Sequence, residues 1–144
     1  MIGRLGAAIL AAGQGTRMRS TLNKVLHPVG GLPMVLWSVG HARALGAAPL
    51  AIVIGKDGDA VRDTVGEGPH YVVQEQQLGT GHALLQAAPA LEGQCDLVLS
   101  LYADMPTLRL ETLQRLVAVH RESGAAISLV SVRSADSMGF GRVV

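Results

Sequence analysis

Short apolar segments of strand length alternate with helical patterns along this chain, and the alternation restricts the folds it can adopt. The apolar segments are residues 5–11, 50–55, 71–74, 96–102 and 125–132. The helical patterns are residues 33–45, 81–88 and 110–123. Nearly continuous apolar character is typical of strands covered on both faces of a sheet, and strand–helix–strand order requires right-handed crossovers. The sequence therefore predicts an α/β fold with a doubly wound, mostly parallel, Rossmann-like sheet.

Residues at the ends of the helical patterns indicate where the helices begin and end. Pro33 suits the first helical position because its φ angle is already fixed near the helical value, and Gly46 ends that pattern. Thr80 can cap the second helix with its hydroxyl, and Gly124 follows the third. We find no internal repeat, low-complexity tract or interdomain linker.

Composition limits the classes of function. The chain has 144 residues, of which 49% are hydrophobic, so it is one domain or part of one with a core of useful size. A net charge of +1 and an aromatic content of 3% favour neither nucleic acid nor a membrane surface as partner. The longest apolar run, residues 45–55, is shorter than the roughly 20 residues that cross a bilayer.

Two features favour a cytoplasmic protein. Arg4 and the apolar residues 6–12 could pass for a short signal peptide, but its cleavage site would fall in a glycine turn, so we predict a first strand instead. Cys95 is the single cysteine of the sequence. It allows no disulfide framework and no cysteine-based metal site, and we expect a buried structural thiol.

The first strand pattern runs directly into a glycine turn, L-A-A-G-Q-G-T-R-M at residues 10–18. Gly13 and Gly15 permit a tight turn that leaves consecutive N–H groups open to an anion, and Arg17 adds a positive charge. The segment matches neither the Walker loop nor the dinucleotide fingerprint, in which a glycine would replace Met18. The alternative is an ordinary β-to-α turn with a solvated Arg17.

A second cation, Lys24, follows this turn within the sequence N-K-V-L at residues 23–26. Two cations beside an amide-lined turn suit a polyphosphate better than a single carboxylate. In a doubly wound sheet, ligands bind beyond the carboxyl ends of the strands, where the strand order reverses. We therefore predict that this turn binds nucleotide phosphates.

The segment that begins at Gln74, Q-E-Q-Q-L-G-T-G-H-A, also leaves a strand and opens a helix. Its Gly-Thr-Gly portion offers free amides and a hydroxyl, and the amide of Gln74 can both donate and accept hydrogen bonds. This combination suits the edge of uracil. The alternative is a threonine cap flanked by turn glycines, and His82 is taken as structural because no partner for it is evident.

Asp104 follows the strand pattern at residues 96–102. A carboxylate just past a strand faces the ligand edge of the sheet, where a hard cation that bridges phosphates would bind. We therefore predict Asp104 as a metal ligand. The alternative is that Asp104 only starts the turn before Pro106.

These motifs together resemble those of a known family. The sequences L-A-A-G-x-G-T-R-M, Q-x-x-x-L-G-T-G-H-A and Y-x-D-x-P, with a lysine after the first, occur in the order and spacing of the bacterial N-acetylglucosamine-1-phosphate uridylyltransferases. The resemblance extends from Leu5 to Val144, including G-F-G-R at residues 139–142. It implies a nucleotide-diphospho-sugar transferase fold, incomplete at its C-terminal side, with residues 1–144 as the amino-terminal part of the domain.

The resemblance implies roles for the matching residues. Arg17 would contact the β- and γ-phosphates and Lys24 the α-phosphate as catalytic cations, and Asp104 would hold Mg²⁺. The nucleotide-binding residues would be Leu10, Ala11, Ala12, Gly13, Lys24, Gln74, Gly79 and Thr80. The sugar-binding residues would be Tyr102, Ala103 and Gly141.

The implied reaction joins UTP and N-acetylglucosamine 1-phosphate into UDP-N-acetylglucosamine and pyrophosphate, by Mg²⁺-assisted in-line attack on the α-phosphorus. Its product serves peptidoglycan and lipopolysaccharide synthesis in the cytoplasm. Relatives that also carry a β-helix acetyltransferase domain form homotrimers through it. We expect a trimer only where that domain is present in the full-length protein.

Three departures from the family pattern are evident. Asn23 replaces a proline, which is expected to loosen the presentation of Lys24; Ala103 replaces a glycine, and Gln14 replaces a lysine. The family's remaining sugar ligands and second metal ligand would lie beyond Val144. Two alternatives therefore stay open: another nucleotidyltransferase that uses CTP or GTP, including the molybdenum-cofactor type, and a non-catalytic nucleotide-binding fragment.

Overall fold

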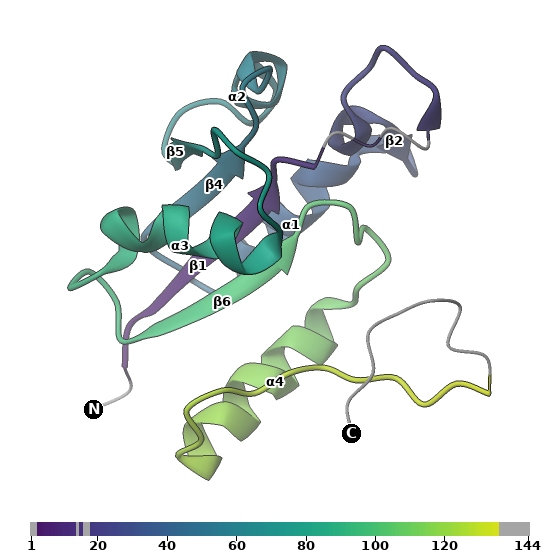
Figure 1. Ribbon diagram of the computed structural model, residues 1–144. Coiled ribbons are helices and arrows are strands. Elements are labelled where there is room, and N and C mark those ends of the chain that lie inside the picture. The colour runs from purple at the N-terminus through teal and green to yellow at the C-terminus, as the bar shows by residue number, and fades with distance from the viewer. Residues whose placement is uncertain (1–2, 14, 16–17, 136–144) are drawn as a thin grey trace. The chain divides into compact units, whose positions relative to one another are not determined.

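A four-stranded parallel sheet forms the centre of the fold (Figure 1). The computed structural model describes residues 3–13, 15 and 18–135 of the chain. The strands of the sheet are β1 (Leu5–Ala11), β4 (Leu50–Ile54), β5 (His70–Val73) and β6 (Leu97–Tyr102). They lie in the order β5-β4-β1-β6, and each neighbouring pair is parallel. This arrangement confirms the predicted α/β fold with a parallel sheet.

The strand order reverses at β1. The chain runs outward from β1 through β4 to β5 and then returns to the other side of β1 as β6. The backbone N–H of Ala103 donates to the carbonyl of Leu10 at 3.1 Å, so β1 and β6 stay joined at their carboxyl ends. Those ends therefore flank the place where doubly wound sheets bind ligands.

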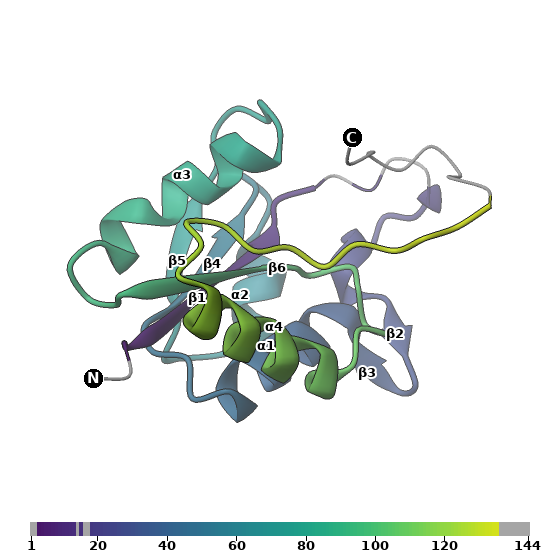
Figure 2. The same ribbon diagram turned by 90° about the horizontal axis from the view of Figure 1, so that it is seen from below.

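Helices cover both faces of this sheet (Figure 2), with α1 (Met34–Ala44) on one face and α3 (Thr80–Leu91) on the other. Side chains of β1 alternate between the two faces. Ala8 packs with Ala87 of α3, whereas Ile9 points to the other face, and all three are fully buried. Burial on both faces explains why the strands read as continuous apolar runs.

Helix α2 (Asp59–Val65) was not predicted from the sequence. Seven residues are too few for a clear helical period, although Val61 and Val65 are buried four positions apart. The hydroxyl of Tyr71 donates to the carbonyl of Gly66 at 2.5 Å and holds the end of α2 near β5. Burial raises the pKa of Tyr71, so the hydroxyl keeps its proton at neutral pH.

A hairpin and a short helix precede α1. The 3₁₀ helix η2 (Lys24–Leu26) leads into the antiparallel strands β2 (Pro28–Val29) and β3 (Leu32–Pro33). Pro33 is thus the residue before α1 rather than its first helical residue, because it pairs with Pro28 in the hairpin.

Helix α3, in contrast to α1, begins one residue earlier than predicted. Gly79 precedes it with a φ of 97°, a conformation that favours glycine. Thr80 is therefore the first residue of the helix, and its hydroxyl makes no capping bond.

Residues Arg109–Val144 form a separate unit from Met1–Leu108. This unit contains α4 (Leu110–Ser123), which Gly124 ends in the left-handed conformation, as predicted. The predicted strand at residues 125–132 is wrong: residues 125–135 form neither helix nor strand. Apolar residues supply the potential for a strand, and in this segment no pairing with another strand realises it. None of the helices in the described part of the chain is long and apolar enough to cross a membrane.

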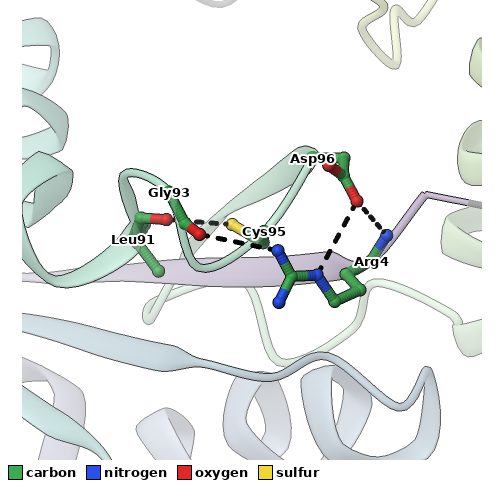
Figure 3. A network of polar contacts seen from close by, with 5 residues as sticks. All are labelled: Arg4, Leu91, Gly93, Cys95 and Asp96. Carbon is green, nitrogen blue, oxygen red and sulfur yellow. Dashed lines mark hydrogen bonds and ion pairs between the residues drawn. The ribbon is translucent and has the colours of Figure 1, made fainter.

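A polar network ties β1 to the turn before β6 at the edge opposite the predicted site (Figure 3). The backbone N–H of Arg4 donates to Asp96 Oδ2 at 2.6 Å, and its guanidinium donates to the carbonyl of Gly93 at 3.5 Å. The thiol of Cys95 is half-buried and donates to the carbonyl of Leu91. A Cβ on Gly6 would lie 2.6 Å from that sulfur, so Cys95 packs tightly and acts as a structural residue.

Candidate nucleotide-binding site

A hollow of about 360 Å³ lies beyond the carboxyl ends of β1, β5 and β6. Its lining residues are Leu10, Ala12, Gly13, Lys24, Val25, Gln74, Gln77, Gly79, Thr80, Ala83, Tyr102 and Asp104. The three segments that the sequence analysis selected therefore meet at one edge of the sheet, where the strand order reverses. Arg17 and Gly141 lie outside the described residues, and their roles stay predictions.

One end of the hollow carries opposite charges. Lys24 Nζ lies 2.5 Å from Asp104 Oδ2, and these residues are 80 positions apart in the sequence. About a third of each side chain is exposed, 34% for Lys24 and 32% for Asp104. The predicted phosphate cation and the predicted metal ligand thus form an ion pair with each other. Both groups are reachable from the hollow and can exchange this partner for a phosphate or a cation.

Asn23 fixes the position of Lys24. Its Oδ1 accepts a hydrogen bond from the backbone N–H of Val25 at 3.2 Å and so caps η2. We expected the replacement of proline by Asn23 to loosen Lys24. The structure shows that Asn23 caps the short helix on which Lys24 lies, and the loosening relative to proline stays a prediction.

The two glycines of the first turn differ in their surroundings. Gly15 has a φ of 59°, and a Cβ at this position would collide with the Cβ of Lys24. Gly13 has no positive φ, and a Cβ there would meet no atom within 4 Å. Gly15 is therefore the glycine that lets the turn and the stem of Lys24 approach each other.

The other end of the hollow is neutral and internally hydrogen-bonded. Gln74 follows β5 and is only 4% exposed. Its Nε2 lies 3.2 Å from the carbonyl of Gly79 and 2.9 Å from Nδ1 of His82. Nε2 of His82 in turn lies 3.2 Å from the amide of Gln86, one helical turn further along α3. The amide of Gln74 is thus held on two sides.

Gln77 links the two loops of the site. Its Nε2 donates to the carbonyl of Ala12, at the end of β1. Sequence reasoning passed over Gln77 and Gln86, and it took His82 as structural with no evident partner, whereas both ring nitrogens of His82 face glutamine amides. Only the spacing of His82 and Gln86, four residues apart on a helix, could have indicated one of these contacts, because the others depend on tertiary structure.

The end of β6 and the turn after it form the remaining wall. The side chain of Tyr102 is 45% exposed, and its carbonyl accepts a hydrogen bond from the buried Ser38 hydroxyl at 2.9 Å. Ala103 is fully buried and is not among the lining residues, and Ala11 is likewise buried. The protein interior accommodates the methyl group of Ala103, and its predicted contact with the sugar stays a prediction.

A metal ion at this edge would depend on few protein ligands. Among residues 3–13, 15 and 18–135, no three His, Cys, Asp or Glu side chains form a group suited to a metal. Among the lining residues that the structure describes, Asp104 is the one that presents a carboxylate to the hollow. This fits Mg²⁺ at nucleotide sites, since Mg²⁺ commonly takes one or two carboxylates and completes its coordination with phosphate oxygens and water.

The fold is that of a nucleotidyltransferase domain. The model of the family described as MobA-like NTP transferase domain matches residues 7–138, and the chain belongs to this family. A solved structure of UDP-glucose pyrophosphorylase complexed with UDP-glucose shares the fold, with a TM-score of 0.70 and 21% identity. That match covers 86% of this chain and 55% of the other.

Curated relatives narrow this assignment. The chain is 49% identical over 142 residues to the "Bifunctional protein GlmU" of Pelobacter propionicus and 43% identical over 145 residues to that of Geobacter metallireducens. These matches cover 97% and 99% of the chain but only 31% and 30% of the relatives. The resemblance to the uridylyltransferase domain of these bifunctional proteins is confirmed, and the chain spans about a third of their length.

Proposed function

We propose that this chain forms the UTP-binding part of an N-acetylglucosamine-1-phosphate uridylyltransferase. One observation carries the proposal: the hollow has a lysine–aspartate pair at one end and a buried glutamine amide at the other. A charged end suits a triphosphate and a neutral hydrogen-bonding end suits a base. The similarity to the GlmU proteins supports uracil as that base and a sugar 1-phosphate as the second substrate.

In the proposed reaction, a phosphate oxygen of N-acetylglucosamine 1-phosphate attacks the α-phosphorus of UTP in line, and pyrophosphate leaves. The attacking and attacked groups both carry negative charge, so the barrier is largely electrostatic repulsion. Lys24 would leave Asp104 and donate to the α-phosphate. Arg17 would contact the β- and γ-phosphates.

The free backbone amides of the first turn would hold the nucleotide along residues 10–13. Asp104 would hold Mg²⁺ together with phosphate oxygens, and bound Mg²⁺ would neutralise part of the phosphate charge. Gln74, Gly79 and Thr80 would contact the uracil, while Tyr102, Ala103 and Gly141 would border the sugar. These side chains bind and align the reactants, and no covalent protein intermediate is required.

The similarity also supports a cellular role. A UDP-N-acetylglucosamine-forming enzyme would act in the cytoplasm and supply peptidoglycan and lipopolysaccharide synthesis. Assembly into a homotrimer would require the β-helix domain that bifunctional relatives carry.

Isothermal titration of the chain with UTP and Mg²⁺ tests the binding step. We expect a single site that prefers UTP to CTP and GTP. Pyrophosphate release in the presence of N-acetylglucosamine 1-phosphate tests catalysis. Binding with turnover supports the transferase, binding without turnover assigns only nucleotide binding to this chain, and absence of UTP binding refutes the proposal. A preference for CTP or GTP would instead favour another nucleotidyltransferase.

A further inference from the structure

The amide of Gln74 has no hydrogen left for a ligand. An amide nitrogen carries two hydrogens, and Nε2 of Gln74 meets two acceptors: the carbonyl of Gly79 at 3.2 Å and Nδ1 of His82 at 2.9 Å. Gln74 is 4% exposed and borders the hollow. The group that Gln74 can still offer to a nucleotide is therefore its carbonyl oxygen, Oε1.

The contacts of His82 determine its tautomer. Each ring nitrogen faces a glutamine amide, and a neutral imidazole has one donor and one acceptor nitrogen. The carbonyl of Gly79 can only accept, so the atom of Gln74 that faces it is Nε2. The same Nε2 faces Nδ1 of His82, and Nδ1 is therefore the acceptor of the second hydrogen. Nε2 of His82 then carries the hydrogen and donates to Gln86, whose amide presents Oε1, since the two orientations of an amide are assigned from such networks.

We propose that His82 is a positioning residue that locks the Gln74 amide, so that Gln74 acts toward the base only as a hydrogen-bond acceptor. This inference rests on the proposed function, in which Gln74 reads the base. A glutamine that is free to turn can match either a donor or an acceptor. A locked acceptor matches N3–H of uracil and opposes the bare N3 of cytosine at the same place.

The hydrogen bond to His82 makes Gln74, which could otherwise accept either base, selective for uracil over cytosine. A well-matched hydrogen-bond pair discriminates between bases by a factor of roughly ten or more. If His82 stops accepting, Gln74 can present its amide nitrogen to cytosine. Loss of the Nδ1 acceptor should therefore lower the preference for UTP over CTP by about tenfold, mainly because CTP binds more tightly.

Two substitutions separate this role from packing. His82→Asn keeps an acceptor oxygen near the position of Nδ1, whereas His82→Leu has similar bulk without an acceptor. Both lose the contact with Gln86, so only the bond to Gln74 distinguishes them. The preference for UTP is measured by calorimetry with Mg²⁺, as the dissociation constant for CTP divided by that for UTP. This preference should be retained in the first variant and should fall about tenfold in the second.

The ¹⁵N resonances of the His82 ring in the unaltered chain provide a measurement that needs no nucleotide. They should show a hydrogen on Nε2 and none on Nδ1. A hydrogen on Nδ1, or an unchanged UTP to CTP ratio in a folded His82→Leu chain, would overturn the inference. If the Leu variant does not fold, the ¹⁵N result decides. Failure of the unaltered chain to bind UTP would refute the proposed function instead. The ring resonances would still show whether Nδ1 of His82 accepts the hydrogen bond from Gln74.

Discussion

The two ends of the hollow are built in contrasting ways. At the phosphate end, Lys24 of η2 and Asp104 after β6 are 80 positions apart in the sequence and neutralise each other across the opening. At the base end, Gln74 and His82 belong to one strand–loop–helix segment, and their neutral groups are hydrogen-bonded before any ligand arrives. A ligand must therefore displace an existing partner at the first end, whereas it meets a prearranged acceptor at the second. Selectivity and charge neutralisation reside in different parts of one site.

Removal of the phosphate cation should have the largest effect. In a form of the protein that releases pyrophosphate, Lys24→Ala should cost about 3 kcal/mol of transition-state stabilisation, as for other prearranged electrostatic groups. The preference for UTP over CTP should stay unchanged, because the base end is intact. Lys56→Ala, which removes an exposed cation paired with Glu75, serves as the control. Equal losses in both variants would contradict a specific role for Lys24.

Removal of the carboxylate charge should affect binding in opposite directions with and without Mg²⁺. In Asp104→Asn, Lys24 loses its competing partner, so UTP should bind more tightly in the absence of metal. The tightening that Mg²⁺ adds to UTP binding should fall by about 2 kcal/mol, since a charged contact is lost. Calorimetry with Mg²⁺ and with a chelator measures both effects. The control Asp57→Asn should change UTP affinity neither with Mg²⁺ nor without it. Weaker metal-free binding of UTP by Asp104→Asn would contradict the view that Asp104 competes with UTP for Lys24.

The shape of the phosphate end should depend on Gly15 rather than Gly13. Gly15→Ala combines a positive φ with a collision against the stem of Lys24, and it should lower the free energy of unfolding by about 1.5 kcal/mol. Gly13→Ala enters open space and should change stability by less than about 0.5 kcal/mol. Urea unfolding of both variants measures the difference. Equal destabilisation would show that the crowding at Gly15 is relieved without cost.

The smallest expected effect is that of salt, which should weaken binding at the phosphate end and leave base selectivity unchanged. Raising the ionic strength should weaken UTP binding by less than about 1 kcal/mol, because partly exposed charges are screened. The ratio of UTP to CTP affinity should stay constant, because neutral hydrogen bonds set it. Calorimetry over a range of NaCl concentrations measures both quantities, and a ratio that changes with salt would place charge recognition at the base end.

Much of the fold was predictable because its strands are covered on both faces. Continuous apolar character marked β1, β4, β5 and β6 to within a residue or two. The same signal failed at residues 125–132, since apolar residues supply the potential for a strand but not the edge with which it pairs. Helix α2 was missed because seven residues carry too short a pattern.

The site was predictable as a set of segments but not as a set of contacts. The glycine turn, Gln74 and Asp104 each follow a strand, and parallel topology brings such positions to one edge. The sequence could not predict that Lys24 binds Asp104 in the absence of ligand. Nor could it assign a role to His82, because the role of a histidine in the first turn of a helix depends on the amide that it faces in the folded structure.

The hydrogen bond from Gln77 to Ala12 has a consequence for how the two halves of a nucleotide are recognised. Ala12 is the first residue after β1, where the chain enters the phosphate turn, and Gln77 lies in the loop between Gln74 and Gly79. Because of this hydrogen bond, a movement of the loop between Gln74 and Gly79 must also displace the phosphate turn. Uridine and triphosphate offered as separate molecules should therefore bind interdependently, each stiffening the place that receives the other.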